Sequence, residues 1–226
     1  MKLTTNKELT ELAIARMERA LENERVVVCM KDPLCLAAFS LLPAIRSHLA
    51  CACTRAYEAE QAINETFSTY LIIDDVPESG SGLELCKKFR HLKTVLLTER
   101  ENDGMVKDAG NAGVDALIFR SQVGGDGSGA LIAGLAQVAR GGVYLPQSVL
   151  EHAGEADEKT FELIATLTEK ERVVLAELGR GLDNASIAEV LFLSEETVKS
   201  HLKAVRQKMN ETDRVKLALL SIRAGL

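Results

Sequence analysis

The sequence lacks the features that place a protein in a membrane or in an export pathway. None of its apolar runs approaches the roughly 20 residues that a helix needs to cross a bilayer. The chain also does not open with the basic stretch and apolar run of a secretory signal, because residues 1–24 are charged and amphipathic. We therefore expect a cytoplasmic protein that does not bind membranes.

Patterns of metal binding and catalysis are absent as well. The five cysteines are an odd number, and none is spaced with a histidine as metal ligands are: Cys29, Cys35, Cys51, Cys53 and Cys86. We find no Ser/His/Asp or Cys/His grouping and no glycine-rich loop that could cradle a phosphate. The sequence therefore predicts no enzyme, no metal and no cofactor, with buried thiols in a reducing cytosol. Cys51 and Cys53 are spaced to share one face of a strand, which leaves a redox role open.

A positive net charge is also missing, since the chain carries −6 at pH 7. Residues 160–226 hold ten basic and ten acidic side chains, so the whole deficit lies in the preceding part. Binding to nucleic acid needs a local basic face rather than a basic protein. The charge therefore leaves room for a DNA-binding segment near the C-terminus, although it predicts weak binding by a single copy.

Short apolar strands alternate with helical patterns through most of the chain. We expect strands at 25–30, 50–54, 70–74, 95–98 and 116–120, and helices at 34–49, 58–64, 83–90, 105–112 and 130–139. Apolar strands separated by helices indicate a parallel sheet covered on both faces. Right-handed crossovers make this a doubly wound, flavodoxin-like α/β domain with five strands. Sites in such sheets lie where strands end, and these ends carry Asp74, Thr98 and Arg120.

Residues 167–226 have the pattern of a helix-turn-helix. Ser194 caps a helix whose first turn carries Glu195 and Glu196, and these acids suit its positive N-terminal end. The helix then alternates apolar residues (Val198, Leu202, Val205, Met209) with basic ones (Lys199, Lys203, Arg206, Lys208). One face can therefore be buried while the other meets phosphates and base edges.

This segment closely resembles the DNA-binding domain of LuxR/NarL-type transcription regulators. Residues 168–175, 187–191, 197–202 and 217–226 are similar to its opening, scaffold, recognition and closing helices. The resemblance implies an all-α domain of four helices that binds double-stranded DNA in a sequence-specific way. It implies base contacts by Lys199, Ser200 and Lys203, backbone contacts by Thr197 and Lys208, and a place for Asn184 in the same DNA-binding set.

The part before it resembles a response-regulator receiver over residues 25–150. By that resemblance Asp74 holds the phospho-acceptor position, and Thr98 matches the hydroxyl at the end of strand four. Receivers hold a divalent cation with two acids that end strand one. Met30 and Lys31 stand at that place here, and Arg120 replaces the lysine that ends strand five.

These departures predict an atypical receiver. Met30 cannot ligate a hard cation and Lys31 would repel one, and the Lys31 side chain could reach Asp74 and form an internal ion pair. Asp32 and Asp75 are the remaining acids, and an improvised cation site built from them stays open. The sequence therefore predicts a transcription regulator that Mg-dependent phosphorylation does not control.

Two other interpretations stay open. One is an ordinary two-component response regulator that a sensor kinase phosphorylates at Asp74. The other is a small-molecule or redox sensor, or an interaction protein, on a receiver fold. The expected parts are an amphipathic helix over 1–24, a receiver-like domain over 25–146, a linker over 147–161 and the DNA-binding domain over 162–226.

We also expect a homodimer, because one helix-turn-helix reads only a few base pairs. The candidate surfaces are the last helix (Leu217, Leu220, Ile222), the fifth helix of the sheet domain (Leu131, Leu135, Val138) and residues 1–24. Residues 1–24 could instead pack on their own domain or dock a protein partner.

Overall fold

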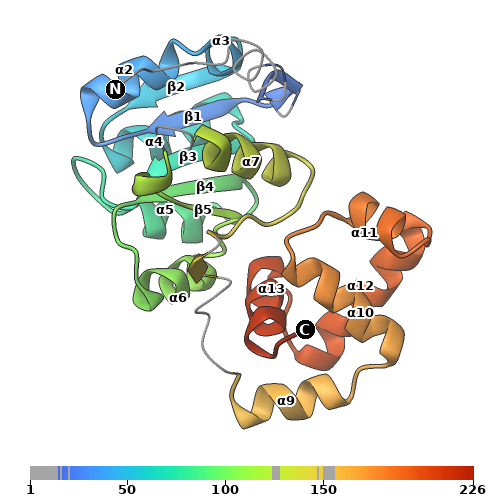
Figure 1. The fold of residues 1–226 in the computed structure, drawn as a ribbon. Helices are drawn as coiled ribbons and strands as arrows, with labels where there is room; N and C mark the ends of the chain where they lie inside the picture. The colour runs from blue at the N-terminus through green and yellow to red at the C-terminus, as the bar shows by residue number, and fades with distance from the viewer. Residues whose placement is uncertain (1–14, 16, 20, 124–127, 147, 150–155) are drawn as a thin grey trace, which may run out of the picture.

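A computed structural model describes residues 15, 17–19, 21–123, 128–146, 148–149 and 156–226. The described chain forms an N-terminal sheet domain and a C-terminal helical domain (Figure 1). Among these residues, no helix combines the length and the apolar character needed to cross a membrane.

The sheet has five parallel strands in the order β2-β1-β3-β4-β5. The strands are β1 (Val26–Cys29), β2 (Leu49–Cys53), β3 (Tyr70–Asp74), β4 (Lys93–Thr98) and β5 (Ala116–Phe119). All residues of β1, β3 and β5 are buried, as expected for strands that are covered on both faces. The predicted doubly wound, flavodoxin-like α/β fold is confirmed.

Helices cover both faces of this sheet (Figure 1). One apolar layer lies under α2 (Pro33–Ser40), α3 (Pro43–Arg46) and α7 (Ser128–Ala139). The other lies under α4 (Ala56–Thr66), α5 (Gly82–Lys88) and α6 (Asp103–Ala112). A 3-10 turn, η1 (Arg120–Gln122), follows β5 directly. Because the strands are parallel, the C-terminal ends of β1, β3, β4 and β5 lie at the same edge of the sheet.

The helix that we expected over 34–49 is two helices followed by a strand. Pro43 stands at the first position of α3, where a proline is tolerated because that N–H has no helical partner. Leu49 already begins β2 and pairs with Val26 of β1. The apolar pattern alone could not separate these elements, because short apolar runs suit a buried helix and a buried strand equally.

The helical domain contains α9 (Glu158–Ala165), α10 (Glu169–Gly179), α11 (Asn184–Val190), α12 (Glu195–Met209) and α13 (Arg214–Arg223). The last four are the predicted helices of the DNA-binding domain. The added helix α9 begins inside the segment expected to be a linker, because Asp157 caps it by accepting a hydrogen bond from the Thr160 N–H at 2.9 Å. Ile164 then joins the apolar core of the domain.

Most of the amphipathic helix expected over 1–24 lies outside the described residues. Within the described part, Met17 and Leu21 are buried among the apolar residues that pack on α3 and α7. These two side chains therefore pack on their own domain rather than on a partner.

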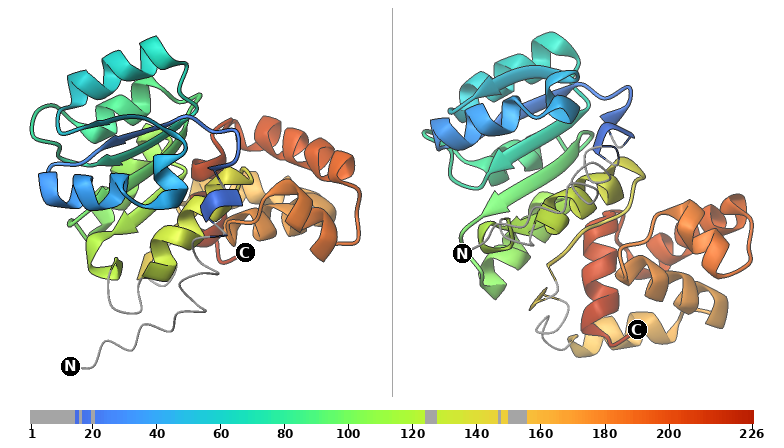
Figure 2. Two further views of the ribbon diagram at one scale, coloured as in Figure 1. Left: turned by 90° about the horizontal axis from the view of Figure 1, so that it is seen from above. Right: turned by 45° about the horizontal axis from the view of Figure 1, so that its top comes forward.

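The two domains meet along α13 and the turn before α11. Figures 1 and 2 place α13 between the sheet domain and the other helices of its own domain. Leu219 of α13 is buried in the apolar layer of α4, α5 and α6. Arg90 forms an ion pair with Asp213 at 3.3 Å, and the Val143 N–H donates to the Gly181 carbonyl at 3.0 Å. Lys199, Ser200 and Lys203 of α12, which carry the expected base contacts, stay exposed.

Gly82 opens α5 beside Asp74, and an added Cβ there would lie 2.1 Å from the main-chain oxygen of Asp74. We expect Gly82→Ala to lower the free energy of unfolding by about 1–3 kcal/mol, because the backbone must shift. Urea unfolding followed by circular dichroism measures this. The control is Gly129→Ala in α7, where an added Cβ meets nothing within 4 Å. Equal losses in the two variants would contradict the close approach at Gly82.

Candidate functional site

Asp74 ends β3 and is only 4% exposed. Its Oδ1 accepts a hydrogen bond from an Arg120 Nη2 at 2.5 Å, which is also an ion pair. Its Oδ2 accepts from the main-chain N–H of Lys31 at 2.8 Å. Both carboxylate oxygens are therefore bound inside the protein, one by a charge and one by a main-chain dipole.

Arg120 follows β5 and reaches Asp74 across the edge of the sheet. Burial acts to lower the pKa of its guanidinium, but the hydrogen bond and the negative charge of Asp74 outweigh burial, so the net pKa lies above its ordinary value. The guanidinium stays charged at any physiological pH in either case. It therefore places a permanent cation against the carboxylate.

Of the two residues that follow β1, Lys31 does not act as we expected. Met30 is 3% exposed and packs in the apolar layer of α3 and α7, so its side chain belongs to the core and offers no oxygen ligand. The Lys31 side chain is exposed, and Lys31 reaches Asp74 through its main-chain N–H. The expectation of a Lys31–Asp74 ion pair is therefore wrong, because the ion pair is made by Arg120.

Asp75 has a separate set of partners. Its Oδ2 accepts from the Thr98 hydroxyl at 3.0 Å and from Arg100 Nε at 2.8 Å, and its Oδ1 accepts from the Val76 N–H at 2.9 Å. The sequence singled out Thr98 but missed Arg100. The only signal for Arg100 was a basic residue just beyond a strand end.

The side chains at this edge do not fit a divalent cation. Asp32 is the N-cap of α2, where its Oδ1 accepts from the N–H groups of Leu34 at 2.7 Å and Cys35 at 3.2 Å. Asp74 and Asp75 already meet guanidinium groups. Within the described part of the chain, no three acidic, histidine or cysteine side chains are grouped so as to hold a metal ion. Hard cations need several free oxygen ligands, which these acids do not offer.

A second candidate surface lies on α12. Ser194 caps this helix by accepting from the Thr197 N–H at 3.1 Å. Val198, Leu202, Val205 and Met209 are buried in the domain core, as the alternating pattern predicted. Lys199, Ser200 and Lys203 are exposed together on the opposite face, and Gln207 is exposed one turn further on. Gln207 was not among the residues that the resemblance assigned to DNA, and only its exposure on this face points to it.

Of the three basic residues expected at DNA, Lys199 and Lys203 are exposed and not held by the domain core. Lys199 lies 3.1 Å from Glu195 and 3.7 Å from Glu196, and the hydrogen bond with Glu195 raises the pKa of Lys199. Exposed pairs of this kind contribute little stability, so phosphates or bases can replace them. Lys203 is exposed on the same face. Thr197 is half-buried, with its hydroxyl 2.7 Å from the Ser194 hydroxyl.

Lys208 and Asn184 have partners inside the domain. Lys208 Nζ lies 2.7 Å from Glu171 Oε2 and donates to the Thr166 carbonyl at 3.2 Å. Its hydrogen bond is the largest cause that lowers the pKa of Glu171. Asn184 Oδ1 accepts from Arg214 at 3.0 Å. To contact the DNA backbone, Lys208 and Asn184 would have to share these protein partners with DNA phosphates or give them up.

Most side chains expected at a dimer surface pack inside one chain. Leu217 is fully buried in the helical domain, and Leu220 packs against the same core. The side chains of α7 are buried against the sheet: Leu131, Leu135 and Val138. Ile222 is half-buried. The apolar pattern predicted burial correctly but could not tell the core of one chain from an interface between two.

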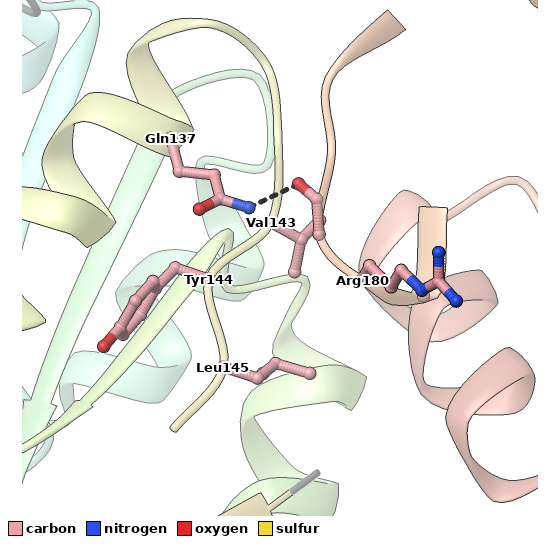
Figure 3. Close-up of a pocket in the computed structure, with 7 residues that line it drawn as sticks. Gln137, Val143, Tyr144, Leu145 and Arg180 are labelled. Carbon is pink, nitrogen blue, oxygen red and sulfur yellow. Dashed lines mark hydrogen bonds between the residues drawn. The ribbon is translucent and has the colours of Figure 1, made fainter. Parts of the chain in front are cut away.

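A small pocket lies between the two domains. Gln137, Val143, Tyr144, Leu145 and Arg180 line it, and Gln137 donates to the Gly181 carbonyl at 2.7 Å (Figure 3). Its volume of about 200 Å³ is below the range of about 300–1,000 Å³ typical of ligand pockets. This pocket therefore gives no support to a small-molecule site between the domains.

The chain is similar to known bacterial regulatory proteins. Residues 165–221 match the family model of bacterial regulatory proteins, luxR family. Transcriptional regulatory protein LnrK of Bacillus subtilis (strain 168) is 31% identical over 185 residues, which cover 75% of this chain and 82% of LnrK. Uncharacterized transcriptional regulatory protein YxjL of the same organism is 30% identical over 172 residues, covering 72% and 77%. A structure of the Salmonella typhimurium RcsB response regulator aligns over 90% of this chain and 99% of its own, at 19% identity and a TM-score of 0.49.

Lys208→Met should leave the buried Glu171 carboxylate without its cation and lower the free energy of unfolding by about 1–3 kcal/mol. Because the folded-state pKa of Glu171 is lowered, this stabilisation is present above the unfolded-state pKa and disappears as pH falls through the folded-state value. The difference between parent and variant should therefore close in acid. Urea unfolding over a pH series measures both effects. The matched control is the exposed Lys203→Met, and equal stability of the two variants would refute the internal role of Lys208.

Proposed function

The chain belongs to the DNA-binding response regulators of the LuxR family, and we propose that its receiver-like domain is not controlled by Mg-dependent phosphorylation of Asp74. We take residues 25–146 as this domain and 162–226 as the DNA-binding domain. The observation that carries the proposal is the engagement of both Asp74 oxygens by Arg120 and the Lys31 N–H.

Phosphoryl transfer to a carboxylate places an attacking oxygen and a charged phosphoryl group in one small space. A divalent cation normally neutralises that charge, and leaving it uncompensated costs several kcal/mol. The acids at this edge do not offer a free oxygen set for such a cation, since Asp32 caps α2 and Asp75 binds Arg100. Arg120 instead keeps the Asp74 carboxylate in an ion pair. A protein partner or a change elsewhere in the domain would have to break this ion pair to alter the site.

DNA recognition is assigned to the exposed face of α12. Lys199, Ser200 and Lys203 project from the first half of a helix that is capped and well packed on its other face. This division suits a helix that enters the major groove with its N-terminal half. The contact between the sheet domain and α13 leaves that face uncovered.

We further propose that the protein acts as a homodimer on two half-sites. One α12 reads only a few base pairs, and the basic charge of a single domain is modest. Leu217 is buried in its own domain, so its side chain takes no part in this dimer surface.

Lys199→Ala should weaken binding to the specific site by about 1–3 kcal/mol if the ammonium group bonds a guanine. The site would first be selected from random duplexes, and fluorescence anisotropy at fixed salt would then give the dissociation constants. The matched control is Lys170→Ala, which removes an exposed lysine from α10 of the same domain. If Lys199→Ala bound the selected site as tightly as Lys170→Ala does, α12 would not be reading bases through Lys199.

Acetyl phosphate with Mg²⁺ should leave Asp74 unphosphorylated, and Asp74→Asn should bind the selected site about as well as the parent. A gel that retards phosphorylated protein measures the first, and anisotropy the second. Lys31→Asp adds a carboxylate after β1, and Arg120→Lys replaces the forked guanidinium by a single ammonium group. This double variant should therefore become phosphorylated at Asp74. A phosphorylated parent protein, with the label lost in Asp74→Asn, would overturn the proposal and favour an ordinary two-component response regulator.

A further inference from the structure

Three of the five cysteines lie together on one face of the sheet. Cys29 ends β1 and Cys53 ends β2, and the two residues are partners in the register of these parallel strands. The Cys53 thiol donates to the main-chain oxygen of Val28 at 3.7 Å, and the neighbouring Cys29 thiol and burial raise its pKa. All three cysteines belong to the layer under α4, and all three are free thiols.

The register determines which of these thiols can be bridged without strain. Adjacent strands lie about 4.8 Å apart, which falls well inside the span of about 4.4–6.8 Å between the Cα atoms of a disulfide. Cys29 and Cys53 meet this condition. Cys51 and Cys53 are two residues apart in one strand, about 6.6 Å, which is close to the upper limit. A Cys51–Cys53 bond would therefore be the more strained of the two.

The three thiols differ in how exposed they are to solvent. Cys51 is half-buried, whereas Cys53 is 7% exposed and Cys29 is fully buried. A reagent from solution therefore reaches Cys51 first, although the less strained bridge joins the two more buried cysteines, Cys29 and Cys53.

We propose that Cys51, Cys53 and Cys29 form a thiol relay that accepts a small disulfide of the glutathione class and ends as a Cys29–Cys53 bridge. The Cys51 sulfur attacks the small disulfide, whose S–S bond breaks and releases one thiol. Cys53 then attacks the Cys51 sulfur of the mixed disulfide and releases the second small thiol. Cys29 attacks Cys53, and Cys51 leaves as a free thiol. In total, two protein thiols lose two electrons and two protons, and one small disulfide becomes two thiols.

The relay is slow at neutral pH and is coupled to the candidate site. Burial, followed by the neighbouring Cys53, raises the pKa of Cys51 to about 11, so few of its molecules are thiolates and sustained exposure is needed. The bridge closes two residues before Lys31, whose N–H binds Asp74. Oxidation thus fixes the end of β1 at the point where it contacts Asp74.

Oxidised glutathione is the probe, applied to the full chain for increasing times before free thiols are trapped with iodoacetamide. Trypsin separates residues 26–31, which contain Cys29, from residues 47–55, which contain Cys51 and Cys53. Mass spectrometry should find these two peptides joined, with the join at Cys53. Recovery of both peptides alkylated at every cysteine, with glutathione confined to the exposed Cys35, would overturn the proposal.

Variants test the order of the steps. Cys51→Ser should lose the joined peptides, and Cys29→Ser should keep the oxidation on residues 47–55, as a glutathione adduct or a Cys51–Cys53 bond. Cys35→Ser is the matched control, and it should form the bridge at the parent's rate. Circular dichroism checks the fold of each variant, and Cys51→Ala replaces Cys51→Ser if the serine disturbs it. A folded Cys51 variant that forms the bridge as fast as the parent would refute the relay.

Discussion

The contact between Arg120 and Asp74 is the constraint on which the candidate site depends. It joins the ends of β5 and β3, and the Lys31 N–H adds the end of β1 to the same carboxylate. Removing one partner of such a buried pair leaves the other charge unpaired, which lowers the free energy of unfolding. A site built in this way favours one arrangement of the sheet edge, whereas a phosphorylated receiver needs a carboxylate that is open to a cation and a phosphoryl group.

The DNA-binding domain depends on a different set of contacts and is coupled to the sheet through α13. Its core cluster consists of side chains of this domain, and its helices are capped by Asp157, Thr168, Asp183, Ser194 and Asp213. Leu219 and the Arg90–Asp213 pair connect it to α6 and its surroundings. Changes in the sheet domain therefore have a physical route to α13, although the exposed face of α12 takes no part in that contact.

Much of the fold could be predicted from the sequence, because strands buried on both faces are apolar throughout, and β3 begins and ends where the pattern predicts. The closeness of Asp74 and Arg120 followed from the rule that parallel strand ends share one edge. The role of Lys31 did not follow, because it depends on where the side chain turns as β1 ends. The thiol cluster required the register of β1 against β2, which local sequence does not specify.

The most direct test of the central claim is a crystal structure grown with Mg²⁺ and beryllofluoride, which mimics a phosphoryl group on an aspartate. The account predicts that Arg120 keeps its ion pair with Asp74 and that no metal is bound beside it. Beryllofluoride on Asp74, with Mg²⁺ coordinated by that carboxylate and by Asp32 or Asp75, would contradict the account.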